Sequence, residues 1–241
     1  PPPSPLMTSA AMMDNPPAFT SREQLRAQLT TSVCPHLFGR FAERLGVLLS
    51  AIGGAKADTG VTHLRTNIHV LLVGDVSTGK SQLLLAAAAI APRSTSTAGM
   101  GCTNAGLTAA ATKEGGEWTL EPGALVLSSG GTCVIDELLT VALADRTALH
   151  EAMEQQTISV AKAGMVTALR TECAVVAACN PRSQARRGND VSNTAGDLGV
   201  GAPLLSRFDL LFTLWDVPRH DRHIGEKILA VATDPTPPAN Y

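Results

Sequence analysis

The feature that most constrains the fold is an eight-residue segment from Gly74 to Ser81, which reads GDVSTGKS and matches the pattern GxxxxGK[ST]. A nearly all-apolar run over residues 68–73 precedes it, and an apolar segment over residues 80–91 follows it. This order predicts a buried strand, a Gly-rich turn and a helix. The backbone N–H groups of such a turn, and the positive end of the following helix, suit a phosphate. The sequence therefore predicts a nucleotide-phosphate site in an α/β fold.

The turn also supplies the candidate nucleotide-binding side chains. Lys80 is expected to reach the β- and γ-phosphates, and the Ser81 hydroxyl is expected to ligate Mg²⁺. A plain Gly-rich turn is the competing interpretation, and the flanking strand and helix disfavour it. The predicted nucleotide-binding residues of this segment are Gly74, Asp75, Val76, Ser77, Thr78, Gly79, Lys80 and Ser81.

A second motif is the apolar run TCVI followed by Asp136 and Glu137. Alone, two carboxylates after a strand usually mark a solvated strand end. Downstream of a P-loop they fit the Walker B role, in which Asp136 holds Mg²⁺ through water and Glu137 orients or deprotonates the attacking water. We therefore expect both residues beside the phosphate site.

Two further candidates flank apolar strands. Asn180 ends the run over residues 174–179, where a polar side chain in a parallel sheet lies among ligands and could position the lytic water; the alternative is a simple Asn-Pro turn. Arg207 stands before the run over residues 210–214, and its planar guanidinium suits phosphate. By itself, Arg207 is more often a structural ion pair, for example with Asp209.

The order of elements predicts an α/β protein with a parallel central sheet and helices on both faces. Residues 94–121 are expected to form a loop and a short hairpin, and residues 157–169 a hairpin turning at 163–164. Apolar residues between Leu37 and Leu49 recur at helical spacing, which predicts a helix ending at Gly53. We divide the chain into a disordered segment (1–17), an ATPase core (18–232) and a flexible tail (233–241).

Composition limits the partners. The net charge is −2, so DNA contact must come from a few local cations, and an aromatic content of 3% argues against a base-stacking platform. The five cysteines form no CxxC pair, which favours reduced cysteines in an intracellular protein. The chain contains no apolar run of about 18 residues, so no membrane span is expected.

These motifs, in this order, resemble the AAA+ module of minichromosome maintenance (MCM) DNA helicases over roughly residues 31–230. The segment HEAMEQQTISVAKAG (150–164) looks like the family's pre-sensor hairpin, and LLSRFDL (204–210) looks like its arginine-finger box. The segments CPHLFG (34–39) and GCTNAGLTAAATKEGGEW (101–118) look most like the ninth paralogue, which is linked to recombination repair.

The resemblance implies a P-loop NTPase that binds ATP and Mg²⁺ and acts in DNA replication or repair. Lys80, Ser81, Asp136, Glu137 and Asn180 would form the cis half of the ATP site. Arg207 would reach the ATP of a neighbouring subunit, and Lys162 would touch DNA in a central channel, with segment 94–121 as a second channel hairpin of steric or coupling role. Implied partners are DNA and other MCM-type subunits in a hexameric ring, with no membrane, and the location is nuclear if the source is eukaryotic and cytoplasmic otherwise.

The chain also departs from the family pattern. The family usually has Pro and Gly where Val76 and Ser77 stand, so a side chain at position 77 could crowd the phosphate loop. The family's N-terminal DNA-binding domain and C-terminal lid are not in the sequence, so we expect a fragment that binds nucleotide and does not unwind DNA unaided.

Three alternatives remain open at this point. One is a ring subunit that binds nucleotide but turns over little ATP. Another is a different AAA+ protein with similar hairpins, such as a transcription activator or a metal chelatase, against which the HEAMEQQ stretch argues. For DNA contact, the arginine cluster Arg182, Arg186 and Arg187 competes with Lys162.

Overall fold

The fold is taken from a computed structural model that describes most of the chain. The described ranges are 21–37, 39–55, 65–99, 102–115, 117–143, 145–162, 165–181 and 199–216, with isolated positions at 222, 225–226, 229 and 233. The expected disordered segment 1–17, and all of the expected tail except Thr233, lie outside these ranges.

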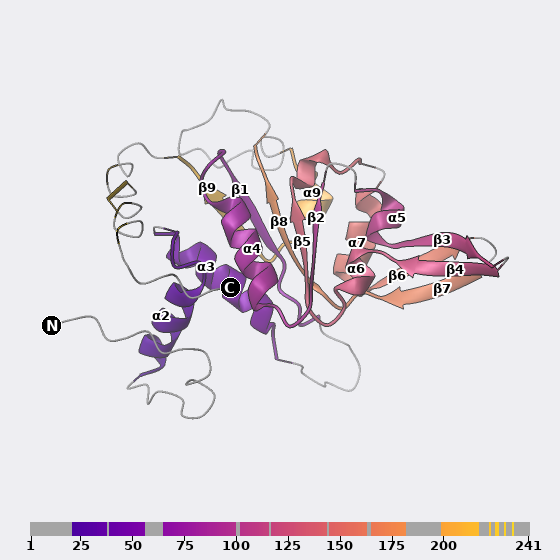
Figure 1. The fold of residues 1–241 in the computed structure, drawn as a ribbon, viewed down its shortest axis with the longest axis horizontal. Helices are drawn as coiled ribbons and strands as arrows, with labels where there is room; N and C mark the ends of the chain where they lie inside the picture. The colour runs from indigo at the N-terminus through magenta and orange to yellow at the C-terminus, as the bar shows by residue number, and fades with distance from the viewer. Residues whose placement is uncertain are drawn as a thin grey trace.

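A five-stranded, all-parallel sheet forms the centre of the molecule (Figure 1). Its strand order is β2-β5-β8-β1-β9. The strands are β1 (Val70–Gly74), β2 (Ser94–Ala98), β5 (Thr132–Asp136), β8 (Ala174–Cys179) and β9 (Leu210–Leu214). The predicted fold class, a parallel sheet flanked by helices, is confirmed.

The apolar runs explain the central strands, because their alternating side chains enter two different cores. Leu71 and Val73 of β1 belong to one buried cluster, whereas Val70 and Leu72 belong to the other. All five residues of β1 are buried, as expected for a strand covered on both faces. This double burial anchors the turn that follows β1.

Helices cover both faces. The cluster with Val70 and Leu72 is closed by α3 (Phe41–Ile52) and α4 (Lys80–Ile90), and α2 (Arg22–Ser32) packs on α3. The opposite cluster is closed by α6 (Ala124–Leu127), α7 (Arg146–Gln155) and α9 (Ala202–Leu205). The short α5 (Asn104–Leu107) and the 3₁₀ turn η1 (Leu138–Thr140) lie on this second side.

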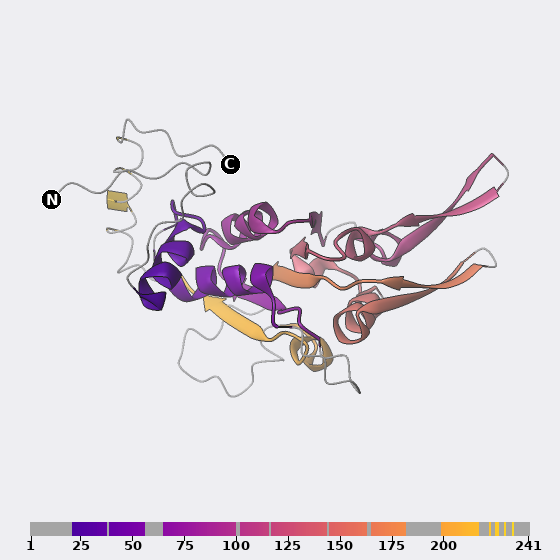
Figure 2. The same cartoon turned by 90° about the horizontal axis from the view of Figure 1, so that it is seen from below.

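Two antiparallel hairpins leave the same end of the molecule and project side by side (Figures 1 and 2). One pairs β3 (Ala109–Glu114) with β4 (Glu117–Pro122), and the other pairs β6 (Thr157–Lys162) with β7 (Met165–Arg170). Both predicted hairpins are therefore present.

Two expectations were wrong in part. Segment 94–121 holds more than a loop and a hairpin, because its start, β2, is the edge strand paired with β5. Its side chains alternate between exposed and half-buried, so it carries no apolar run. The helix expected from Leu37 begins only at Phe41, after Arg40 adopts a left-handed φ of 56°.

All five cysteines are free thiols in the structure. Within the described ranges, no helix combines the length and apolar character that a membrane crossing requires.

Candidate nucleotide-binding site

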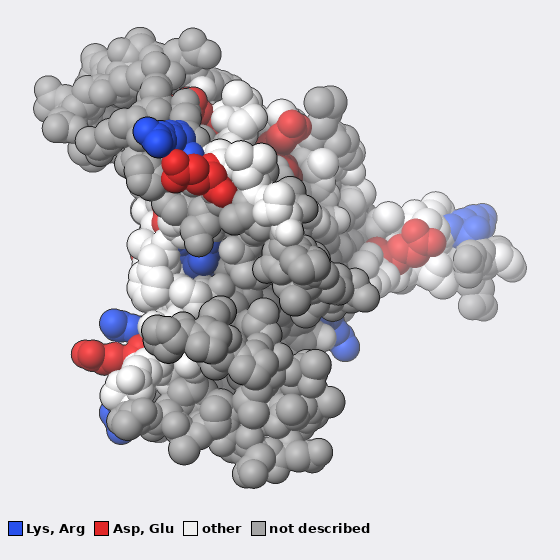
Figure 3. All heavy atoms as spheres, turned by 60° about the vertical axis from the view of Figure 1, so that its left-hand side comes forward, with Lys and Arg blue, Asp and Glu red and all other residues white. Residues whose placement is uncertain are grey.

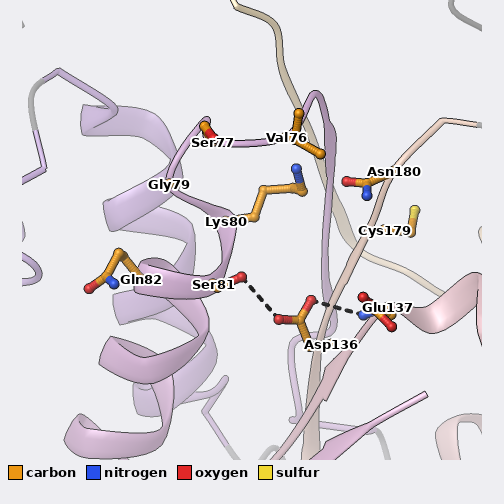
Figure 4. A pocket seen from close by; sticks show the side chains of 10 residues that line it. All are labelled: Val76, Ser77, Gly79, Lys80, Ser81, Gln82, Asp136, Glu137, Cys179 and Asn180. Carbon is orange, nitrogen blue, oxygen red and sulfur yellow. Dashed lines mark hydrogen bonds between the residues drawn. The ribbon is translucent and has the colours of Figure 1, made fainter. Parts of the chain in front are cut away.

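The carboxyl ends of three neighbouring strands meet at one cavity of about 410 Å³ (Figure 4). The strands β5, β8 and β1 are adjacent in the sheet, so their ends bring Asp136, Cys179 and the turn after Gly74 together. Ligands of parallel sheets bind at this edge, and the volume is within the range of ligand sites. The lining residues are Val76, Ser77, Gly79, Lys80, Ser81, Gln82, Asp136, Glu137, Cys179 and Asn180.

Gly74, Asp75 and Thr78 do not line the cavity but shape the turn behind it. A Cβ on Gly74 would collide with the Leu214 carbonyl oxygen, so only glycine lets β9 approach there. The Asp75 N–H donates to the Leu214 carbonyl at 3.1 Å. The Thr78 hydroxyl donates to the Asp75 carbonyl at 2.8 Å, which closes the turn.

The turn ends where α4 begins, and Gly79 sits at this junction with a φ of 91°. A side chain at position 79 would overlap Leu37, which packs over the turn instead of continuing a helix. The N–H groups of the first turn of α4 have no partner within the helix, so they and the helix dipole suit an anion.

Lys80 is buried and folded back onto the turn. Its Nζ donates to the Gly74 carbonyl at 2.9 Å and the Asp75 carbonyl at 2.5 Å. It forms no ion pair with a described residue, and burial lowers its pKa. A buried cation that has only neutral acceptors is well suited to a phosphate.

Ser81 and Asp136 meet across the floor of the cavity. The Ser81 hydroxyl donates to Asp136 Oδ2 at 3.0 Å (Figure 4). A hydroxyl beside a carboxylate supplies the oxygen ligands that Mg²⁺ prefers, and in P-loop proteins Mg²⁺ is held by such a pair. The residues present therefore fit the ion.

Glu137 follows β5 in a left-handed conformation with a φ of 52°, and its N–H donates to Asp136 Oδ1 at 2.9 Å. Its carboxylate is exposed and has no hydrogen-bond partner among the described residues. A non-glycine residue rarely adopts this conformation, and such strain is common at functional sites. The turn points a free carboxylate along the cavity, where it can accept a proton from water.

Asn180 follows β8 and points its amide toward the Lys80 ammonium (Figure 4). Because β8 lies between β5 and β1, its end lies between Glu137 and the P-loop. Cys179 and Gln82 also line the cavity, and neither was predicted as a site residue from the sequence. Burial raises the pKa of Cys179 to about 11, so this thiol stays neutral at pH 7.

Ser77 adopts a φ of 63°, a region that favours glycine. Val76 beside it is exposed and also lines the cavity. The two departures from the family pattern therefore stand at the mouth of the site, and Ser77 carries the strain that a glycine would avoid.

Arg207 is not part of this cavity. It precedes β9, so it lies near the amino end of the sheet, whereas the P-loop follows the carboxyl end of β1. β1 and β9 are parallel, with Val70 opposite Leu210 and Gly74 opposite Leu214. The four residue steps from Val70 to Gly74 span about 13 Å at the rise of a strand. Arg207 therefore cannot reach the nucleotide site of its own chain without a large rearrangement.

The guanidinium of Arg207 pairs with Glu154 of α7 and donates to the Pro203 carbonyl. Its Nε is buried without a hydrogen-bond partner among the described residues. The expected alternative pair with Asp209 is wrong, because Asp209 pairs with Arg65 at 2.5 Å. Neither Glu154 nor Arg65 was identified from the sequence, because their partners lie more than fifty residues away along the chain.

The candidate DNA-contacting residues are only partly described. Lys162 is the last residue of β6, opposite Met165, near the outer end of its hairpin. Arg182, Arg186 and Arg187 lie outside the described residues. On the neighbouring hairpin, Trp118 is half-exposed and the Lys113 ammonium lies 5.9 Å from its ring centre. In Figure 3 the visible described residues form no continuous basic patch.

Comparison with known proteins identifies the family. A family model described as the MCM P-loop domain matches residues 14–232. The chain is 47% identical over 213 residues to "Probable DNA helicase MCM9" of Oryza sativa subsp. indica, covering 87% of this chain and 31% of that protein. Its namesake in Arabidopsis thaliana is also 47% identical, over 85% of this chain and 32% of that protein.

More distant relatives match the same region. "Minichromosome maintenance protein MCM" of Saccharolobus solfataricus is 42% identical over 86% of this chain and 30% of that protein. The chain thus spans about a third of the length of the curated relatives that it matches. The expected resemblance to the ninth paralogue is confirmed, and the other AAA+ classes are excluded. The chain belongs to the minichromosome maintenance family and contains its nucleotide-binding P-loop domain.

Proposed function

We propose that this chain is the ATP-hydrolysing core of an MCM-type DNA helicase. The observation that carries the proposal is the convergence, in one cavity, of a buried lysine on a P-loop, a serine–aspartate pair, a free carboxylate and an amide. The plant relatives, which are named as probable DNA helicases, support the activity.

The residues divide the chemistry among them. Lys80 leaves its two backbone carbonyls and binds the β- and γ-phosphates, while the first turn of α4 donates N–H groups. Ser81 and Asp136 would hold Mg²⁺, which would neutralise charge on the phosphates when bound. Asn180 orients a water molecule, and Glu137 takes its proton as the water oxygen attacks the γ-phosphorus. The bond from that phosphorus to the bridging oxygen breaks, and ADP and inorganic phosphate leave.

Arg207 acts in trans in this proposal. Its place near the opposite end of the sheet supports a role at the ATP site of an adjacent subunit, where it would stabilise the charge of the transferring phosphoryl group. The site of one subunit is then completed by the next, as in a hexameric ring of MCM-type subunits.

The DNA contact is assigned to the hairpin β6–β7 with Lys162 near its turn. Because the chain has a net charge of −2, binding relies on a few cations repeated around the ring. Relatives named as replication licensing factors support replication, and the plant relatives support the ninth-paralogue role in recombination repair. Both roles, and the eukaryotic relatives, favour a nuclear location.

One observation favours a second candidate, a ring subunit with little turnover. Ser77 has a left-handed φ of 63° in the phosphate-binding turn, where the family has glycine. The side chain would reduce the space or freedom of the loop while leaving nucleotide binding possible.

Separating binding from hydrolysis tests the proposal. Lys80→Ala should abolish nucleotide binding, measured by titration calorimetry. Glu137→Gln should keep nucleotide affinity and stop multiple-turnover hydrolysis in the assembled protein. Parental turnover by Glu137→Gln would contradict the assignment, and negligible turnover by the parent itself would favour the second candidate.

A further inference from the structure

Arg65 lies ahead of β1, outside every motif of the nucleotide site, yet its guanidinium joins its own segment to two others, helix α7 and the loop before β9. Nη2 donates to Asp209 Oδ1 at 2.5 Å. Nη1 lies 3.4 Å from the carbonyl oxygen of Arg207 and 3.4 Å from that of Met153. One side chain thus binds both the backbone of the candidate arginine finger and the last turn of α7.

Asp209 is held from its other side as well. Its Oδ2 accepts the His69 N–H at 2.8 Å, and its own N–H donates to the His69 carbonyl at 3.0 Å. At Asp209, the loop that carries Arg207 is therefore bound to His69, the residue before the buried strand β1. Arg65 also binds the Arg207 carbonyl. The backbone of this loop is therefore held at two positions, Arg207 and Asp209.

The contact of Arg65 with Met153 concerns the side chain of Arg207. Met153 precedes Glu154, the carboxylate that pairs with the Arg207 guanidinium. By binding both the Met153 and the Arg207 carbonyls, Arg65 sets the distance between α7 and the loop. The direction in which Arg207 leaves the surface therefore depends on Arg65.

A purely structural ion pair is the competing interpretation. The Arg65 and Asp209 side chains are 27% and 36% exposed. Ion pairs at such exposure contribute little to stability, so a structural role predicts small effects on folding and none on catalysis. Arg65 is also near the amino end of β1, at the opposite end from the P-loop, and it touches no residue of the nucleotide cavity.

We propose that Arg65 is a positioning residue for Arg207, which through its contacts with Asp209 and two backbone carbonyls aims the arginine finger at the ATP of the adjacent subunit. This inference rests on the proposed trans role of Arg207. Only the planar fork of an arginine satisfies all three acceptors, one on α7 and two on the loop that carries Arg207, whereas a single ammonium satisfies fewer of them.

The test measures ATP turnover in the assembled full-length protein and nucleotide affinity of the separate subunit. Arg65→Gln should lower turnover about 10- to 100-fold, the loss expected when a catalytic group is misplaced by about 1 Å. Nucleotide affinity of its own site should stay unchanged. Arg65→Lys should retain part of the turnover. Arg222→Gln is the matched control, because it removes an arginine from the exposed pair with Glu226 and should change neither quantity.

A double variant separates positioning from structure. If Arg65 acts only through Arg207, then Arg65→Gln combined with Arg207→Ala should turn over ATP at the rate of Arg207→Ala alone. Losses that multiply would overturn the inference, as would parental turnover by Arg65→Gln. Thermal melts of each variant identify misfolding, and if Arg65→Gln does not fold, the same cycle with Arg65→Lys decides.

A different variant, Arg207→Ala, tests the proposed trans role by itself. Parental turnover by Arg207→Ala, with assembly confirmed, would overturn the trans role and this inference with it. A large loss in Arg207→Ala together with independent, multiplying losses in Arg65→Gln would leave the trans role intact and refute only the positioning by Arg65.

Discussion

Acid should destabilise this domain through His69. The ring is buried, with 1% of the residue exposed, and it bridges three elements. Its Nδ1 accepts the Val175 N–H at 2.9 Å, so Nδ1 must be unprotonated in the folded state. Its Nε2 lies 3.4 Å from the Met153 carbonyl. Burial lowers the pKa of His69 to about 4, with Arg65 adding to this effect and Asp209 opposing it.

The size of the effect follows from the two protonation states. The unfolded chain has a His69 pKa of 6.5, so between pH 6.5 and about 4 it binds a proton that the folded chain excludes. The contribution of neutral His69 to the free energy of unfolding is fully present above pH 6.5 and is lost as the pH falls toward 4. The full difference corresponds to about 3.4 kcal/mol, of which about 2 kcal/mol is already lost at pH 5.

Urea unfolding at pH 7.5, 6 and 5 measures this loss. His69→Asn is the test variant, since an amide oxygen can accept the Val175 N–H but does not titrate in this range. The parent should lose about 2 kcal/mol more than His69→Asn between pH 7.5 and 5. His36→Asn, at an exposed histidine, should follow the parent. Equal pH dependence of the parent and His69→Asn would refute the argument.

Three further predictions concern the site. Ser77→Gly should raise the free energy of unfolding by about 0.5 kcal/mol, because relief of a left-handed side chain exceeds the entropy that glycine adds to the unfolded chain; a lower urea midpoint would contradict this. Arg207→Ala should leave subunit nucleotide affinity unchanged and cut turnover of the assembly by a factor of about 10³–10⁵. Mixing it with Lys80→Ala subunits should restore some turnover, and no rescue in any mixture would argue against a trans role. Lys162→Ala should weaken single-stranded DNA binding and flatten the slope of log affinity against log salt by about 0.7. If charge removal at residues 182–187 flattens that slope instead, the hairpin assignment is wrong.

The sequence predicted the parts of the fold whose signals are local. β1 and β8 are continuous apolar runs because they are buried on both faces, and a polar residue or a glycine marks their ends. The edge strand β2 was not predicted. None of its side chains is fully buried, so its sequence, STSTA, contains no apolar run. Leu37 fits the helical spacing of apolar residues but lies outside the helix. Its side chain is apolar because it packs over Gly79 of the phosphate turn.

The candidate site shows the same division. Lys80 and Asp136 stand in short motifs, because the phosphate-binding turn and the strand end require those residue types next to each other in the chain. Arg65 and Glu154 carry no such signature, since what matters is their contact with segments far away in sequence. Only the folded structure brings them to Arg207.

The placement of the P-loop and Arg207 near opposite ends of parallel strands gives the subunit a polarity. A contact that joins one end to the other is head-to-tail, so it cannot be satisfied symmetrically in a twofold dimer. Two such subunits would share one complete site. An open row would always have one fewer complete site than it has subunits, whereas a closed ring would complete the nucleotide site of every subunit. Closure of the ring would then raise the ATP turnover per subunit abruptly, although the structure of each subunit stays the same.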